Sequence, residues 1–127
     1  MNGHTIALLG TLDTKGAEYE FVQQCLLARG CHTLLIDVGI LEPPGITPDI
    51  TRQEVAAAGG GKLETVAAEQ DRGRALALMS AGAKELLPKL HAAGRFDAIL
   101  ALGGSGGTSI ACAAMRALPL GVPKVMV

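Results

Sequence analysis

The sequence predicts an α/β domain with a Rossmann-like, doubly wound parallel sheet that is incomplete at its C-terminus. Short apolar runs alternate with longer segments of helical periodicity, which is typical of β-α-β units. Two of the apolar runs, residues 5–9 and 98–102, lead directly into turns rich in glycine, threonine and serine. Because β-α-β crossovers make neighbouring strands parallel, we expect both turns at the same edge of the sheet.

The first β-α unit begins with a strand predicted at residues 5–9. Helical spacing of apolar residues follows at residues 15–29. Asp13 or Thr14 is the expected N-cap, since a short side-chain oxygen can accept a hydrogen bond from the first turn. Gly30 is the expected end of this helix, because glycine adopts the left-handed conformation of many C-caps.

The middle of the chain is predicted to be less regular. A second strand is expected at residues 33–37, and prolines and glycines make residues 39–48 a stiff loop. A capping box at residues 51–54 predicts a short helix, which ends at three glycines, residues 59–61. No regular structure is predicted for the polar residues that follow, up to about Gln70.

The last third of the chain predicts two more β-strands and two helices. A long helix is expected at residues 72–93, shortened or kinked by Pro88. A strand at residues 98–102, a small-residue helix at 110–118 and a strand at 124–127 follow it. We expect the strand order 2-1-3-4, in which strands one and three flank the point where the order reverses.

The predicted fourth strand has no helix after it to cover its second face. With 127 residues, the chain has room for one domain with a single core. We therefore interpret residues 1–127 as the first lobe of a longer protein. An apolar strip is expected to be exposed near the end of the chain, where a second lobe or a partner chain would cover it.

Composition excludes several classes of protein. The net charge is −1, charged residues make up 18% of the chain, and no basic block is present. A nucleic-acid surface needs clustered lysine and arginine, so no nucleic-acid partner is expected. The apolar run near the N-terminus is too short for a signal peptide or a membrane span. We therefore expect a cytoplasmic protein without a membrane partner, whose three cysteines are buried thiols.

The glycine-rich turn at residues 103–108 is the strongest indication of function. Its glycines permit positive φ and leave no Cβ between backbone N–H groups and a ligand, and the helix that follows favours an anion at its N-terminus. We predict that phosphates bind there and that the turn at residues 10–14 forms the opposite wall. The candidate binding residues are Gly10, Thr11, Asp13, Thr14, Asp37, Gly39, Gly103, Gly104, Ser105, Gly106, Gly107 and Thr108.

Three alternatives remain open on the residues alone. The spacing Gly104-x-Gly106-x-x-Ser109 is a degenerate dinucleotide fingerprint with Asp37 as the ribose-binding acid, which suggests half of an NAD(P)-binding oxidoreductase. Residues 103–107 also match the nucleophile elbow of serine acyl hydrolases with Ser105 as nucleophile, although no His, Asp or Glu follows Ser105. The third alternative is an interaction module with a vestigial pocket.

Metal binding is predicted only as an accompaniment of a phosphate ligand. The three histidines are dispersed, and no metal site of the protein's own is expected. Asp13 could hold a phosphate-bound Mg²⁺ from the first turn, although helix capping is its expected role.

Two sequence blocks are distinctive enough to suggest a family. Gly10-Thr11-Leu12-Asp13-Thr14-Lys15-Gly16 and Gly103-Gly104-Ser105-Gly106-Gly107-Thr108, with the strand end at residues 35–39 between them, resemble the uncharacterised bacterial, fungal and plant family of the tomato mosaic virus resistance protein. The resemblance runs over essentially the whole chain. It implies an ATP-binding α/β lobe, with Mg²⁺, that belongs to a two-lobed and often dimeric region of a longer protein. No reaction follows from it.

Overall fold

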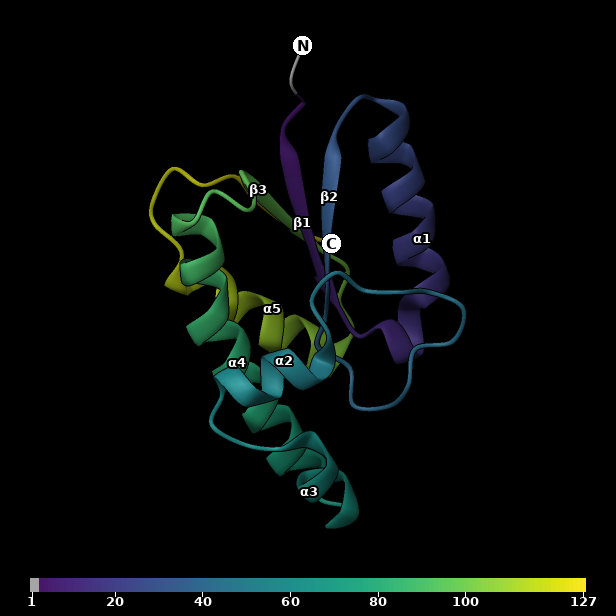
Figure 1. Ribbon diagram of the computed structural model, residues 1–127, viewed down its shortest axis with the longest axis vertical. Helices are drawn as coiled ribbons and strands as arrows, with labels where there is room; N and C mark the ends of the chain where they lie inside the picture. The colour runs from purple at the N-terminus through teal and green to yellow at the C-terminus, as the bar shows by residue number, and fades with distance from the viewer. Residues whose placement is uncertain (1–2) are drawn as a thin grey trace.

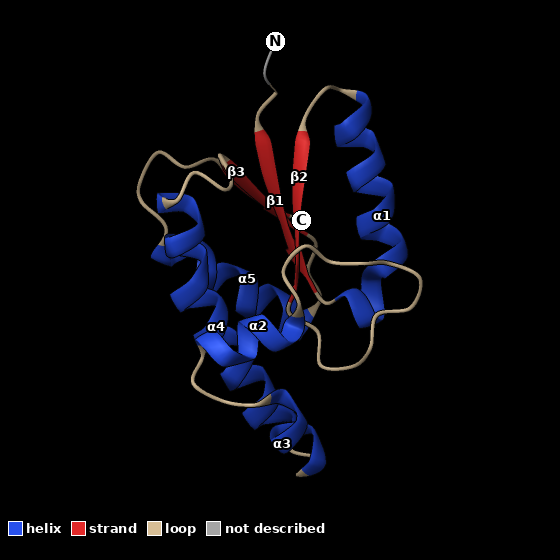
Figure 2. Cartoon of the chain, viewed as in Figure 1, coloured by secondary structure: helices blue, strands red, loops and turns tan. Residues whose placement is uncertain are grey.

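A four-stranded parallel sheet with helices on both faces forms the centre of the molecule (Figures 1 and 2). The structure is a computed structural model that describes residues 3–127. In chain order, the elements are β1 (Thr5–Gly10), α1 (Leu12–Ala28), β2 (His32–Asp37), α2 (Arg52–Ala58), α3 (Leu63–Ala68), α4 (Arg72–Ala92), β3 (Ala98–Ala101), α5 (Ser105–Ala117) and β4 (Lys124–Met126).

The strand order is β2-β1-β3-β4, and every neighbouring pair is parallel. Both features confirm the prediction from the sequence. Leu8 of β1 lies between Leu35 of β2 and Leu100 of β3. The second half of β1 is buried on both faces, whereas in β3 only Ile99 and Ala101, on one face, are fully buried. The strand order reverses between β1 and β3, and ligands of open α/β sheets bind at the carboxyl ends of the strands on either side of such a point.

The two faces of the sheet are covered unequally. Figure 1 shows α1 on one side of the sheet and α2, α4 and α5 on the other. Alternate strand residues therefore enter two separate cores. Ala7, Leu9 and Ile99 pack in the larger core under α2, α4 and α5, whereas Leu8 and Leu35 pack in the smaller core under α1.

Tyr19 of α1 connects the carboxyl ends of β1 and β3. Its buried hydroxyl donates to the Leu9 carbonyl at 2.6 Å and accepts from the Leu102 N–H at 2.7 Å. Burial raises the pKa of Tyr19 to about 12. A Cβ at Gly10 would lie 2.1 Å from the Tyr19 ring, so only glycine fits beside it. Tyr19 thus holds the beginnings of the two predicted binding turns side by side.

The predicted apolar strip near the end of the chain is present. Val125 lies next to Leu100 in the β3–β4 register, on the face that α1 covers only over β1 and β2. The side chains of Val125 and Val127 are 49% and 71% exposed.

Helix α3 was not predicted. Residues 62–70 are polar on average, but Leu63 and Val66 have helical spacing and are both buried. These two apolar residues are enough to hold a short helix against its neighbours. The prediction of an irregular segment up to Gln70 was therefore wrong.

Two helices begin earlier than predicted. Helix α1 begins at Leu12 with Thr11 at the N-cap, so neither Asp13 nor Thr14 caps it. The Leu12 N–H donates instead to the Asp37 carboxylate at 3.3 Å, a long-range partner that a local sequence pattern does not reveal. Helix α5 begins at Ser105, so the glycine-rich segment forms its first turn.

Two smaller predictions were also wrong, and one of the two effects expected of Pro88 is excluded. None of the glycines at 103, 104, 106 and 107 has positive φ, because the chain there is extended and then helical. Helix α4 runs through Pro88 to Ala92 without being shortened. Cys25 is exposed, and Cys31 and Cys112 are half-buried, so the thiols are free but not core residues.

Candidate functional site

A cavity of about 470 Å³ lies at the carboxyl ends of the strands, beside the reversal of strand order. This size is within the range of small-molecule sites, about 300–1,000 Å³. Four segments surround it: the first turn of α1, the loop after β2, the corner between α3 and α4, and the first turn of α5. The lining residues are Thr11, Asp13, Thr14, Lys15, Gly39, Ile40, Leu41, Val66, Ala67, Gln70, Asp71, Arg72, Ala75, Gly104, Ser105, Gly106 and Gly107.

Most of the predicted binding residues reach this cavity. Eight of them line it: Thr11, Asp13, Thr14, Gly39, Gly104, Ser105, Gly106 and Gly107. The other four, Gly10, Asp37, Gly103 and Thr108, do not. The convergence of the first and third turns, which were predicted to face each other, is therefore present in the structure.

The first turn of α5 leaves backbone donors directed at the cavity. Gly104 occupies the N-cap and has no side chain to accept a hydrogen bond. The Thr108 N–H makes the first intrahelical bond, to the Gly104 carbonyl at 3.0 Å. Helix geometry leaves the three N–H groups before it, those of residues 105–107, without an intrahelical acceptor. By contrast, α4 is capped by the Asp71 carboxylate, which accepts from the Arg74 N–H at 3.1 Å.

The glycines of this turn allow close packing rather than unusual backbone angles. A Cβ at Gly103 would lie 1.9 Å from Thr108 Oγ1, so a side chain there would clash. Cβ atoms at Gly104 and Gly107 would lie 3.8 Å from Lys15 Cε and 3.8 Å from Thr11 Cγ2. These two distances show how closely the first turn of α1 faces the first turn of α5.

Two cationic side chains line the cavity, and sequence reasoning did not select either. Neither Lys15 nor Arg72 forms an ion pair within residues 3–127. Lys15 interrupts α1 with φ −125° and ψ 25°. A cation near the positive end of a helix dipole is unfavourable unless an anion lies between them. Lys15, close to Gly104 at the start of α5, therefore favours an anionic ligand.

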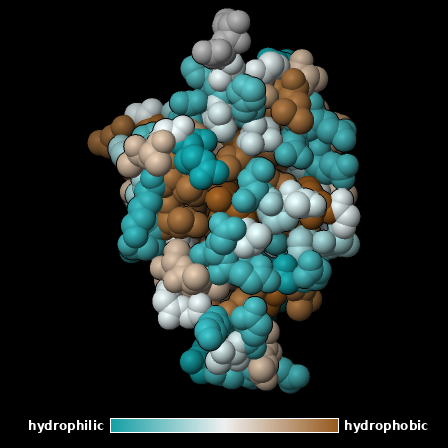
Figure 3. Space-filling view, viewed as in Figure 1, coloured by the Kyte–Doolittle hydropathy of each residue, from teal (hydrophilic) through white to brown (hydrophobic). Residues whose placement is uncertain are grey.

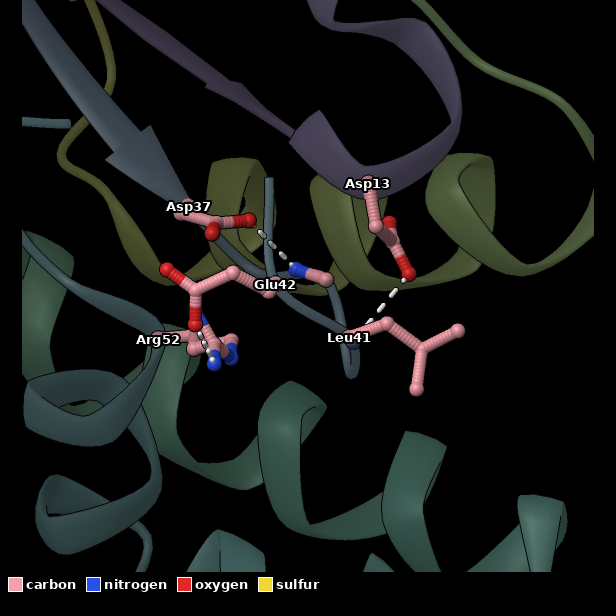
Figure 4. Close-up of polar contacts among 6 residues, drawn as sticks. Asp13, Asp37, Leu41, Glu42 and Arg52 are labelled. Atoms are coloured by element: carbon pink, nitrogen blue, oxygen red, sulfur yellow. Dashed lines mark hydrogen bonds and ion pairs between the residues drawn. The ribbon is translucent and has the colours of Figure 1, made fainter. Parts of the chain in front are cut away.

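Asp37 does not line the cavity but holds two segments that do, through the polar contacts at the end of β2 (Figure 4). The residue is fully buried, and its Oδ1 accepts from the Gly39 N–H at 2.8 Å and from the Leu12 N–H at 3.3 Å. Burial raises the pKa of this carboxyl, and the two backbone hydrogen bonds and the nearby Arg52 guanidinium counteract the effect. The backbone thus uses one oxygen of the carboxylate, while Oδ2 is buried without a hydrogen-bond partner in the described residues.

Asp13 faces the loop after β2 and leaves one oxygen unused. Its Oδ2 accepts from the Leu41 N–H at 3.2 Å, while its Oδ1 is buried without a hydrogen-bond partner. A Cβ at Gly39 would lie 2.5 Å from Asp13 Oδ1 and 3.0 Å from Asp37 Oδ1, so the two aspartates require glycine there. An ion pair between Arg52 and Glu42, at 2.7 Å, fixes the same loop from its other side (Figure 4).

Ser105 has no histidine near it in this chain. His4 precedes β1 and His32 begins β2, so both lie at the amino ends of the strands. His91 lies near the end of α4 and packs against Phe96, just before β3, with ring centroids 5.5 Å apart. All three are at the sheet edge opposite Ser105.

Residues 3–127 hold neither a cluster of metal-ligating side chains nor a membrane-spanning helix. No three or more His, Cys, Asp or Glu side chains gather in a metal-binding group there. No helix in the described chain is both long and apolar enough to cross a membrane.

Comparisons with known proteins place the chain in a family. A family model described as "Uncharacterised protein family (UPF0261) N-terminal domain" matches residues 4–127. A UPF0261 protein of Clostridium tetani is 44% identical over 122 residues, which cover 96% of this chain and 30% of that protein. A UPF0261 protein of Rhizobium meliloti is 42% identical over 122 residues, which again cover 96% of this chain and 30% of that protein. The chain spans about a third of the length of the curated relatives that it matches.

The similarity to the tomato protein is more limited than the two sequence blocks suggested. The ToMV susceptible protein tm-1 of Solanum lycopersicum is 41% identical over 56 residues, which cover 44% of this chain and 7% of that protein. The similarity that extends over nearly the whole of this chain is with the bacterial proteins. This chain belongs to the N-terminal domain family of UPF0261, an uncharacterised protein family.

Proposed function

We propose that the cavity binds a nucleotide whose phosphates lie against the first turn of α5. The observation that carries this proposal is the convergence of unused backbone donors at residues 105–107 with Lys15 and Arg72. Backbone N–H groups at a helix N-terminus, together with unpaired cations, match the charge and the many acceptor oxygens of a polyphosphate.

The apolar lining of the cavity supports a nucleotide rather than a simple anion. Ile40, Leu41, Val66 and Ala75 line the cavity together with its cationic groups. A ligand that carries a flat, weakly polar base beyond its phosphates would bury that surface. ATP is the nucleotide that the resemblance of the two sequence blocks implies, and the reaction, if the protein performs one, is left open.

Mg²⁺ would fit beside the phosphates through Asp13. Mg²⁺ in nucleotide sites uses one or two carboxylates and completes its coordination with phosphate oxygens and water. Asp13 lines the cavity and has a buried oxygen without a partner. We therefore assign Asp13 as the residue that would hold the ion.

The two enzymatic alternatives have less support in the geometry. A dinucleotide site needs a carboxylate that is free to bind ribose hydroxyls, but Asp37 is fully buried and already accepts two backbone hydrogen bonds. Acyl hydrolysis needs a base within reach of Ser105, and the histidines of this chain are at the opposite edge of the sheet.

The proposal includes a second lobe or a second copy of the chain. The exposed Val125 and Val127 extend the apolar face of the sheet beyond the area that α1 covers. Such a strip is usually buried by another domain or subunit. Free cysteines without a disulfide fit the reducing cytoplasm.

A thermal-shift titration tests the ligand assignment. We expect ATP with Mg²⁺ to raise the melting temperature, because a ligand at one hundred times its Kd stabilises the folded state by about 2.7 kcal/mol. ADP should give a smaller shift, and NAD and NADP none at equal concentration. A shift with NAD or NADP but not with ATP would favour the dinucleotide alternative, and no shift with any of the four would contradict the proposal.

A further inference from the structure

Helix α1 has a second apolar face, on the side away from the sheet. Its inner side packs on the sheet through Gly16 and Tyr19, which are buried. On the opposite side, four residues are exposed and follow each other at intervals of one helical turn. They are Ala17, Phe21, Cys25 and Ala28, and we name them the outer stripe. A surface helix normally carries polar residues on this side.

Nothing within residues 3–127 covers the outer stripe. Figure 1 shows α1 at the outside of the molecule, with no helix or strand beyond it. Figure 3 shows apolar residues at the surface over the upper part of α1, among hydrophilic ones. Phe21 is 66% exposed, and the residues one turn before and after it, Ala17 and Cys25, are small. A large side chain between two small ones can fit into the hollows of a facing helix.

Two charged residues flank the outer stripe, one near each end. Glu18 and Arg29 are eleven residues apart (29 − 18), which is about three helical turns, so both lie on the same flank. Both are exposed, and neither forms an ion pair within the described chain. One end of the outer stripe is thus negative and the other is positive. A complementary helix needs the reverse order of charges, which α1 itself has when it is turned end to end.

We propose that two copies of the protein pair through the outer stripes of their α1 helices, which lie antiparallel about a two-fold axis. With the axis midway between Phe21 and Cys25, Phe21 of each copy faces Cys25 of the other. Glu18 of each copy then lies beside Arg29 of the other, because the two pairs have nearly the same midpoint in the sequence. Apolar and charged contacts therefore fit one register, and each occurs twice, as in an isologous interface.

This inference does not depend on the nucleotide site, because none of the outer-stripe residues lines the cavity. The apolar strip at Val125 and Val127 is also separate, since it lies on the sheet rather than on the outside of α1. A second lobe that covers the strip leaves the outer stripe free to pair.

Sedimentation velocity measures the pairing. One helix pair buries less than the roughly 800 Å² per partner of a standard interface, so we expect a reversible dimer of twice 13.0 kDa that forms in the micromolar range. Phe21→Ala should lower the association constant about tenfold or more, since aromatic residues at the centre of an interface carry much of its energy. Glu18→Arg and Arg29→Glu should each lower it to a similar extent, because like charges would meet at both ends of the pair.

An equimolar mixture of Glu18→Arg and Arg29→Glu is the decisive sample. In a mixed pair, opposite charges again meet at both ends, so dimers should form with nearly the wild-type affinity although each variant alone forms few. The double variant, with both substitutions in one chain, should dimerise in the same way. Because the restored contacts are charged and exposed, high salt should weaken the dimers of both samples.

Two variants serve as matched controls. Arg95→Glu reverses the charge of another exposed arginine that lies just after the end of a helix, α4. Leu120→Ala removes a fully exposed apolar side chain away from α1. Both should dimerise as the wild type does. A wild type that stays monomeric at about 1 mM, dimers that Arg29→Glu does not weaken, or a mixture that stays monomeric would overturn the pairing.

Discussion

Gly10→Val is expected to destabilise the fold by about 2–4 kcal/mol, because it places new atoms where the Tyr19 side chain lies. A Cβ at residue 10 would be 2.1 Å from the Tyr19 hydroxyl. Displacing Tyr19 would break its hydrogen bonds to Leu9 and Leu102 and leave buried backbone groups without partners. The free energy of unfolding, measured by urea denaturation, checks this result.

Gly73→Ala is the control for that substitution. Gly73 lies in α4, and the nearest atom that its Cβ would meet is Asp71 Oδ1, at 3.4 Å. Alanine is favoured over glycine in helices, so this change should stabilise the protein by up to about 1 kcal/mol. If Gly10→Val lost no more stability than an ordinary surface substitution, Tyr19 would not be the residue that holds the two turns together.

Gly106→Val is expected to reduce ATP affinity by about a hundredfold or more, whereas Ser105→Ala should reduce it by less than about tenfold. A single neutral hydrogen bond contributes about 0.5–1.5 kcal/mol, which limits what the loss of the Ser105 hydroxyl can cost. Gly106 is helical and lines the cavity, so a branched side chain would occupy space next to the N–H groups of residues 105–107, which we propose bind phosphate. Isothermal titration calorimetry of both variants measures the difference.

Two further measurements make that comparison decisive. A Cβ at Gly106 would lie 3.3 Å from Leu76 Cδ2, so urea denaturation must show that Gly106→Val remains folded at the temperature of the titration. Ester hydrolysis should be absent from the wild type and from both variants. An esterase activity that Ser105→Ala abolishes, together with a wild type that does not bind nucleotides, would support the acyl hydrolase instead.

The sheet could be predicted from the sequence because its signals are local. Each inner strand is a short apolar run, and the segments between these runs have helical spacing. A helix that connects two strands of one sheet makes a crossover, so the strands are parallel. The order β2-β1-β3-β4 then followed from placing the first and third strands at the reversal. The exposed strip at Val125 followed from the lack of a covering helix.

The site could be predicted only in part, because its remaining components depend on contacts between distant segments. Gly106 and Gly107 were selected as turn residues, but their segment is helical because α5 packs its later residues, such as Ile110 and Ala114, into the core. Packing of this kind overrides the low helix propensity of glycine. Asp37 was interpreted as a ligand-binding acid, whereas the backbone of Gly39 and Leu12 uses its carboxylate.

Lys15 and Arg72 show the same limit most clearly. They lie 57 residues apart in the chain (72 − 15), and Arg72 has no neighbouring pattern that marks it as a binding residue, whereas Lys15 lies in the first sequence block without having been selected. Arg72 reaches the cavity because α3, which was not predicted, turns the chain back toward α5. Arg72 could not be grouped with the glycine turns before the fold was known, whereas the position of Lys15 directly after residues 10–14 was a signal that could have found it.

The most direct test of the nucleotide site is to follow backbone amide resonances while ATP and Mg²⁺ are added to ¹⁵N-labelled protein. At 13.0 kDa, the chain is small enough for each amide to be resolved. The nucleotide site predicts that the largest shifts occur at Ser105, Gly106 and Gly107, with smaller shifts at Lys15 and Arg72. Saturable shifts that cluster elsewhere, or no shifts at millimolar ATP, would contradict binding of the phosphates at the first turn of α5.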